Sequence, residues 1–212
     1  MRDRDAPLTA DAIDGLAWDK MDGLLPVVVQ DAANGSVLML GYMNRDALRA
    51  TLESRRVTFW SRSKARLWTK GETSGHHLEL ASVHADCDDD ALLVRATPRG
   101  PTCHLGTASC FGSGEVHGPA WLATLANIVA DRAASGEASS YTARLLAEGL
   151  PKIAQKVGEE GVEVALAAVT RDNDGLAEEA ADLLYHLTVL MQARGLRWDD
   201  VVDRLKARHT TV

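Results

Sequence analysis

The chain has 212 residues with a formal charge of −7, and 46% of its residues are apolar. This apolar fraction is typical of a folded globular protein and excludes a disordered chain. The acidic balance argues against nucleic acid as a partner, because binding to phosphate backbones depends on dense Lys and Arg.

The first fifteen residues are charged and contain no apolar stretch, so they read as neither a signal peptide nor a transit peptide. The longest apolar runs, such as residues 24–29, are too short to span a bilayer. We therefore expect a soluble, cytoplasmic protein with no membrane partner.

Short apolar runs alternate with turn residues from about 24 to 97, a pattern that predicts strands. Asn34-Gly35 is typical of a hairpin turn. Residues 44–55 break the pattern, because Leu48 and Leu52 recur at helical spacing and Asn44 or Asp46 could cap a helix. The first half is predicted to be an α+β domain with mostly antiparallel strands.

A Gly-rich polar stretch follows Phe111, and the sequence beyond it favours helices at 121–134, 141–149, 150–170 and 176–195. Gly149, Gly175 and Gly195 are expected at helix ends. We predict one domain over residues 1–114 and a second, all-α bundle over residues 115–212.

All three cysteines lie between residues 86 and 110, in DCDDDALLVRATPRGPTCHLGTASC. Asp86, Asp88 and Asp90 alternate, so an extended segment would place them on one side and Cys87 on the other. Carboxylates suit Mg²⁺, and thiolates select a softer ion such as zinc. The segment is therefore a candidate for two metal sites on opposite faces.

Three thiolates leave a tetrahedral zinc one ligand short, so the fourth position belongs either to His84 or His104, or to a catalytic water. An EF-hand is excluded, because Ala91 and Thr97 stand where that loop needs Gly and Glu. A zinc deaminase needs a PCxxC motif that Cys103 and Cys110 do not form. The remaining alternative is an acidic turn with inert thiols.

The second half carries two acidic pairs, each with members three residues apart, at the edges of apolar helix faces. These pairs are Glu160 with Glu163 and Glu179 with Asp182. Carboxylates buried together need a cation, and Mg²⁺ is the natural one. Gly158 and Gly161 are costly within a helix, which suggests a close backbone or ligand. Lys152 and Lys156 could meet nucleotide phosphates, although pairing of Lys156 with Glu160 is an ordinary alternative.

At this point the sequence resembles two known families. WSRSKARLWTKGETSGH, DCDDD and GPTCHLGTASCF over residues 20–112 resemble phosphoribosyl-AMP cyclohydrolase. GLPKIAQKVGEEGVEVALAA and EEAADLLYHL resemble phosphoribosyl-ATP pyrophosphatase, an all-α enzyme of the MazG-like type. Together they resemble the bifunctional hydrolases that catalyse steps two and three of histidine biosynthesis.

The resemblance implies that Cys87, Cys103 and Cys110 bind zinc, with Cys87 from one chain of a homodimer and the other two from its mate. It implies Mg²⁺ at Asp86, Asp88 and Asp90, where Asp89 adds an acidic neighbour, and a second Mg²⁺ site in the bundle. That second site would comprise Glu160, Glu163, Glu179 and Asp182.

The implied reactions are two successive hydrolyses. The bundle releases pyrophosphate from phosphoribosyl-ATP, and zinc hydroxide in the first domain then opens the adenine ring of phosphoribosyl-AMP. Expected nucleotide contacts are Arg62, Arg66, Lys70, Thr73, Ser74, Gly75, Lys152 and Lys156. Candidates for proton transfer are His76, His77 and His104, which the sequence does not rank.

Two other hypotheses stay open on the sequence. One is a house-cleaning nucleotide pyrophosphatase fused to a zinc-stapled dimerisation module. The other is a metal-sensing dimer without turnover. A basic hairpin edge with core tryptophans is likewise an alternative interpretation of the segment around Arg62 and Arg66.

Overall fold

The computed structural model describes residues 3–112, 116–137 and 139–209. The chain divides into two compact units, Met1–His117 and Gly118–Val212. The predicted boundary between residues 114 and 115 lies outside the described residues. Each unit has its own hydrophobic cluster.

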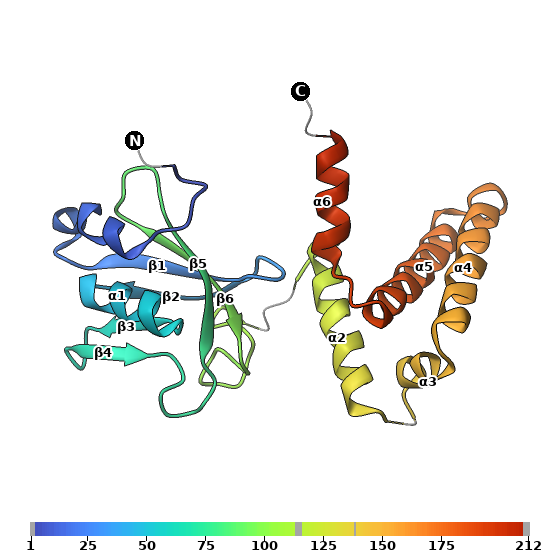
Figure 1. Ribbon diagram of the computed structural model, residues 1–212, viewed down its shortest axis with the longest axis horizontal. Helices are drawn as coiled ribbons and strands as arrows, with labels where there is room; N and C mark the ends of the chain where they lie inside the picture. The colour runs from blue at the N-terminus through green and yellow to red at the C-terminus, as the bar shows by residue number, and fades with distance from the viewer. Residues whose placement is uncertain (1–2, 113–115, 138, 210–212) are drawn as a thin grey trace. The chain divides into compact units, whose positions relative to one another are not determined.

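The first unit contains a four-stranded sheet, a two-stranded sheet and one α-helix (Figure 1). The order of the larger sheet is β2-β1-β6-β5; β1 pairs with β6 in parallel, and the other neighbours are antiparallel. The smaller sheet is the antiparallel pair β3-β4. The elements are η1 (Ala10–Gly15), η2 (Trp18–Met21), β1 (Leu25–Asp31), β2 (Val37–Met43), α1 (Arg45–Ser54), β3 (Thr58–Ser61), β4 (Arg66–Thr69), β5 (Leu78–Ala85) and β6 (Leu92–Pro98).

The alternating sequence explains this sheet. Leu25, Val27 and Val29 of β1 are fully buried, whereas the residues between them are partly exposed. The predicted helix forms as α1, and the side chain of Asn44 caps it by accepting from the Ala47 N–H. The strands and helix predicted for this half are thus confirmed, with one parallel pair in the sheet.

The two short 3₁₀-helices before β1 were not predicted. The second, η2, is anchored by Trp18, whose ring is completely buried and whose indole N–H donates to the Ile13 carbonyl at 2.7 Å. Arg45 lies over the same ring, 5.3 Å from its centroid. This anchor fixes the position of Lys20, two residues further on.

The second unit is helical throughout its described part (Figure 1). It comprises η3 (Gly118–Ala120), α2 (Trp121–Ser135), α3 (Tyr141–Glu148), α4 (Leu150–Thr170), α5 (Asn173–Ala193) and α6 (Trp198–His209). The long helices α4 and α5 pack against each other, and α2 and α3 pack against this pair. The buried apolar centre is formed by Val129, Leu145, Ile153 and Val189.

The predicted helices are confirmed, with two corrections. Gly175 lies within the first turn of α5 and does not end a helix, because Asp172 caps α5 by accepting from the Gly175 N–H. Helix α6 was missed, since its sequence is strongly charged and no residue in it is buried. Among the described helices, none combines the length and the apolar character needed to cross a membrane.

Candidate metal centres and substrate cleft

Cys103 and Cys110 lie in a loop that follows β6 and closes back on the sheet. The Cys103 carbonyl accepts from the Gly106 N–H at 3.0 Å, and the Cys110 N–H donates to the Leu38 carbonyl of β2 at 2.8 Å. Both thiols line a cleft of about 480 Å³. Its walls also include Trp68, Lys70, Glu72, Thr73, Ser74, His76, Thr102 and His104.

The two thiols of this cleft differ in acidity. The Leu105 N–H and the Thr107 hydroxyl lower the pKa of the Cys103 thiol, because both favour the thiolate. Burial raises the pKa of the Cys110 thiol, and the neighbouring Cys103 raises it further. Two adjacent sulfurs, one of them biased toward thiolate, make a donor set that suits a soft metal ion.

Lys70 is the basic residue inside this cleft. Its side chain is only 8% exposed, and its ammonium donates to the His76 carbonyl at 3.3 Å. Burial lowers the pKa of Lys70, whereas the nearby Cys110 and Cys103 oppose that shift. A buried ammonium with a single neutral acceptor is suited to meet an anionic group in the cleft.

The other predicted nucleotide contacts of this unit divide between the cleft and its surroundings. Thr73 and Ser74 line the cleft, and Gly75 follows them in the same turn. Arg66 pairs with Glu72, a cleft residue. Arg62 lies 4.0 Å from the centre of the Tyr42 ring, in a cation–π contact on the β3–β4 hairpin.

The structure separates the three candidate histidines. His76 and His104 line the cleft, and one ring nitrogen of His104 lies 3.9 Å from the Cys103 sulfur. His77 lies elsewhere, with its Nδ1 2.9 Å from the Gly75 carbonyl and its Nε2 3.6 Å from Glu79. The geometry therefore favours His76 and His104 over His77 for chemistry in this cleft.

Two glycines shape the position of His76. A Cβ on Gly71 would lie 2.5 Å from the His76 carbonyl group, and a Cβ on Gly100 would lie 2.7 Å from the His76 ring. Both glycines have positive φ values, +84° and +98°. The close approach of Gly71 to the His76 carbonyl group and of Gly100 to the His76 ring thus holds this residue in the cleft wall.

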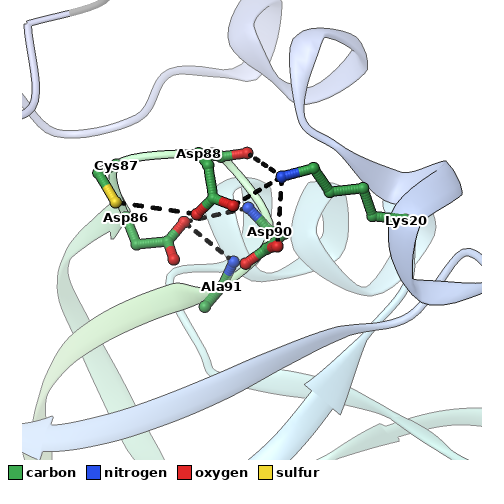
Figure 2. A network of polar contacts seen from close by, with 6 residues as sticks. All are labelled: Lys20, Asp86, Cys87, Asp88, Asp90 and Ala91. Carbon is green, nitrogen blue, oxygen red and sulfur yellow. Dashed lines mark hydrogen bonds and ion pairs between the residues drawn. The ribbon is translucent and has the colours of Figure 1, made fainter.

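Residues 86–90 form a turn between β5 and β6, not the extended segment that the sequence suggested. Asp86 accepts the Asp90 and Ala91 N–H groups at 3.0 and 3.2 Å (Figure 2). Asp89 has a φ of +64°. The expected separation of Cys87 from the carboxylates is wrong. Ligand atoms of Asp86, Cys87 and Asp88 lie within 4.8 Å of one another.

Lys20 of η2 reaches this turn across 68 residues of sequence (Figure 2). Its Nζ lies 2.6 Å from Asp88 Oδ2 and 3.4 Å from Asp90 Oδ2. The Lys20 ammonium lowers the pKa of the Asp88 carboxyl. No local pattern in the sequence pointed to Lys20, because the contact depends on the anchored position of η2.

The exposed Cys87 lines a second, open cleft of about 870 Å³, together with His84, Asp86 and Arg95. His84 has ring contacts with Ser82 Oγ at 3.1 Å and the Arg4 carbonyl at 3.3 Å. The three cysteines are therefore divided, one in this cleft and two in the smaller one.

In the second unit, Glu160 of α4 and Glu179 and Asp182 of α5 have carboxylate oxygens within 4.8 Å of one another. Glu160 is 4% exposed and Glu179 is 9% exposed. The structure thus brings together three of the four predicted acidic ligands. It also confirms that Glu160 occupies a buried position on its helix.

Glu163 lies beside this group on the exposed side of α4. The charge of Glu160 raises the pKa of the Glu163 carboxyl, and loss of hydration and the Glu179 charge act in the same direction. Arg171 offsets part of the charge through an ion pair with Glu179. The acidic group is still crowded enough to favour a bound cation.

Lys156 forms ion pairs with Glu159 at 2.9 Å and Glu160 at 3.1 Å. The pairing of Lys156 with Glu160 that the sequence offered as an alternative is therefore observed, and both carboxylates raise the pKa of Lys156. Lys152 contacts Gln155 at 3.3 Å. A Cβ built on Gly158 or Gly161 would meet no atom within 4 Å among the described residues, apart from the glycine's own stretch of helix. The described part of this chain therefore does not supply the close backbone that these glycines suggested.

Sequence reasoning missed His186 and Tyr141. His186 is 5% exposed, and its Nδ1 lies 2.9 Å from the Asp182 carbonyl and 3.4 Å from Glu160 Oε1. The Tyr141 hydroxyl lies 3.1 Å from His186 Nε2. The YH pair in DLLYHL was the available signal, because a buried histidine on a helix needs polar partners.

Comparison with known proteins gives matches to both units. The family model described as phosphoribosyl-AMP cyclohydrolase matches residues 39–112. The model described as phosphoribosyl-ATP pyrophosphohydrolase matches residues 122–209. The cleft residues fall within the first match, and the acidic group of α4 and α5 falls within the second.

Curated relatives match across both units. Proteins from Photobacterium profundum and Escherichia coli are each 56% identical to this chain, over 91% and 92% of it and 95% of each relative. A protein from Xylella fastidiosa (strain Temecula1) is 57% identical over 96% of the chain and 98% of the relative. All three are named histidine biosynthesis bifunctional protein HisIE.

Proposed function

Because this chain belongs to the HisIE family of bifunctional histidine-biosynthesis proteins, we propose that its two units catalyse two successive hydrolyses. The second unit hydrolyses phosphoribosyl-ATP to phosphoribosyl-AMP and pyrophosphate. The first unit then opens the adenine ring of that product. The observation that carries this proposal is the identity of more than half of the aligned residues across both units, in the same domain order.

Each unit carries one reaction, and the domain boundary that the sequence predicts lies between residues 114 and 115, close to the division between the two units. In the second unit, Glu160, Glu163, Glu179 and Asp182 hold Mg²⁺. The donor set fits this ion, since the residues supply hard oxygens and their crowded charge raises the pKa of Glu163. Mg²⁺ supplies charge neutralisation for the triphosphate and its pyrophosphate leaving group.

The chain's own residues prepare this site in two ways. Lys156 pairs with Glu160 at 3.1 Å and so holds its carboxylate in place from within the same helix. His186 contacts the same Glu160 oxygen as Lys156, at 3.4 Å, and its other ring nitrogen lies 3.1 Å from the Tyr141 hydroxyl. Lys156, which pairs with Glu160, and Lys152, about one turn before it on α4, contact the outer phosphates of the nucleotide.

In the first unit, Cys103 and Cys110 hold zinc together with Cys87 from the partner in a homodimer. The division of the cysteines between two clefts supports this sharing. Zinc lowers the pKa of bound water to about 7, which supplies a nucleophile at neutral pH. Asp86, Asp88 and Asp90 hold a further Mg²⁺ through hard carboxylate oxygens.

The cleft residues bind and orient phosphoribosyl-AMP. Lys70, Thr73, Ser74 and the adjoining Gly75 contact its phosphate and ribose, and Arg62 and Arg66 extend this surface along the hairpin. In ring opening a C6–O bond forms, the C6–N1 bond breaks and a proton reaches the released nitrogen. His76 and His104 are the groups placed to move that proton.

A reducing compartment keeps such thiols available for metal, so the cytoplasm is the proposed location. The proposed substrates are nucleotides, including an ATP derivative. Nucleic acid is not a proposed partner, because the chain has 30 acidic and 23 basic residues.

The test incubates purified protein with phosphoribosyl-ATP, Mg²⁺ and Zn²⁺ and follows pyrophosphate release and the ultraviolet change of ring opening. Cys103→Ser should abolish ring opening and retain pyrophosphate release, and Glu160→Gln should do the reverse when phosphoribosyl-AMP is supplied. Loss of both activities in either folded variant would refute the assignment of one reaction to each unit.

A further inference from the structure

The carboxylates of the acidic turn already contact a positively charged side chain of the same protein, that of Lys20. The ammonium of Lys20 is surrounded by three oxygens: Asp88 Oδ2 at 2.6 Å, the Asp88 carbonyl at 3.4 Å and Asp90 Oδ2 at 3.4 Å (Figure 2). An ammonium that contacts several oxygens in this way occupies a place that suits a small hard cation.

The Lys20 contact is built into the fold. Trp18, the first residue of η2, is completely buried, and the Ala17 N–H, immediately before η2, donates to the Asp89 carbonyl of the turn at 2.9 Å. The positive φ of Asp89 directs the chain through this turn. Lys20 is therefore delivered to the carboxylates by a segment that is itself bonded to the turn.

The three aspartates of the turn have different roles. One carboxylate oxygen of Asp86 is occupied by two N–H groups of the turn, so Asp86 maintains the turn's shape. Asp88 and Asp90 direct oxygens to Lys20. Lys20 thus occupies carboxylate oxygens of Asp88 and Asp90 that belong to the proposed Mg²⁺ site.

We propose that Lys20 is an internal counter-ion of the Asp88–Asp90 pair, which Mg²⁺ must displace, and that it thereby sets the Mg²⁺ affinity of the first unit. The proposal rests on the Mg²⁺ assignment made above. Lys20 lies outside residues 39–112, the region that the cyclohydrolase family model matches. Its role is that of a positioning residue with respect to the reaction.

Displacement of Lys20 from the carboxylates should lower the affinity of the turn for Mg²⁺. When Mg²⁺ enters, the ion pairs between Lys20 and the two carboxylates are lost, and their energy is subtracted from metal binding. The Lys20 side chain is 51% exposed, so water and salt screen these pairs. Removal of the charge should therefore tighten metal binding about three- to tenfold at low salt.

The experiment uses the full-length protein with Mn²⁺ as a paramagnetic stand-in for Mg²⁺. Free Mn²⁺ is measured by electron paramagnetic resonance during titration of the wild type, Lys20→Met, Lys20→Arg and the control Lys64→Met. Lys64 lies in the exposed turn between β3 and β4. All proteins also carry Glu160→Gln, which removes a ligand of the other proposed site.

The expected result is a three- to tenfold lower dissociation constant for Lys20→Met, with Lys20→Arg and Lys64→Met close to the wild type. The difference should shrink at high salt, because screening already weakens the Lys20 contacts. An unchanged or higher dissociation constant for Lys20→Met would overturn the proposal. Such a result would mean that Lys20 only shapes the turn or has no influence on the metal.

A further variant distinguishes this failure from failure of the metal assignment. Asp88→Asn/Asp90→Asn should abolish the Mn²⁺ binding that Lys20→Met strengthens. If binding persists in the double variant, the metal is not at this turn, and both the site and the role of Lys20 are refuted. If binding is lost but Lys20→Met has no effect, only the counter-ion proposal fails.

Discussion

Replacement of Gly100 by alanine tests whether the position of His76 matters for ring opening. An alanine Cβ would lie 2.7 Å from His76 Cδ2 and 3.0 Å from Cγ. Non-bonded carbons rest at about 3.5–4.0 Å, so the ring would have to move by about 1 Å. Gly71 lies against the carbonyl group of His76, so the backbone of His76 is also closely packed.

A displacement of about 1 Å in a catalytic group can reduce a rate by about 100-fold. The substitution also places alanine at a φ of +98°, which costs about 1–2 kcal/mol of stability. Gly35→Ala provides the matched control. Gly35 has a φ of +76°, and the nearest atom to a Cβ placed on it is the flexible end of Gln30 at 3.8 Å.

The assay measures ring opening of phosphoribosyl-AMP and pyrophosphate release for both variants, together with urea denaturation. Gly100→Ala should lose about 10- to 100-fold in ring opening and keep pyrophosphate release. Gly35→Ala should share only the loss of stability. Equal ring-opening rates in the two variants would refute a role for His76 in the reaction.

Three further predictions follow from the same structure. Neighbouring charge raises the pKa of Glu163, so the ionised side chain destabilises the folded, metal-free protein above that raised pKa, and this destabilisation is absent below the ordinary Glu pKa. Glu163→Gln should therefore raise Tm in EDTA at pH 7, and an unchanged Tm at pH 7 would contradict this. Gly41→Ala would drive a Cβ into the buried Phe59 ring, so urea denaturation should show a loss of about 1–3 kcal/mol, and an unchanged midpoint would argue against this packing. Lys70→Met removes the only Lys or Arg among the described residues that line the smaller cleft, and should lower kcat/KM for ring opening about 10- to 100-fold; an unaffected rate, with pyrophosphate release as the internal control, would exclude Lys70 from substrate binding.

Local patterns were sufficient for most of the fold. The alternation of β1 and the helical spacing of Leu48 and Leu52 predict their elements because burial follows the side-chain period. Helix α6 escaped this reasoning, since it buries no residue and so has no apolar face to detect. Gly175 was misassigned because Asp172 caps α5 three residues before it.

The sequence by itself determined which chemical groups the chain offers for metal binding and catalysis. Thiols, a DxDxD segment and paired carboxylates on helices are donor types that suit soft and hard metal ions, and they carried the resemblance that the comparisons confirmed. The burial of Glu160 also followed from its place on an apolar helix face.

Only the tertiary structure decided which of these groups meet. It turned the predicted extended segment at Asp86–Asp90 into a turn that holds Lys20, and it separated Cys87 from the cleft of Cys103 and Cys110. It also placed His76 in that cleft and His77 outside it. Such contacts join residues far apart in the chain or depend on backbone direction at single residues, and neither is encoded in local periodicity.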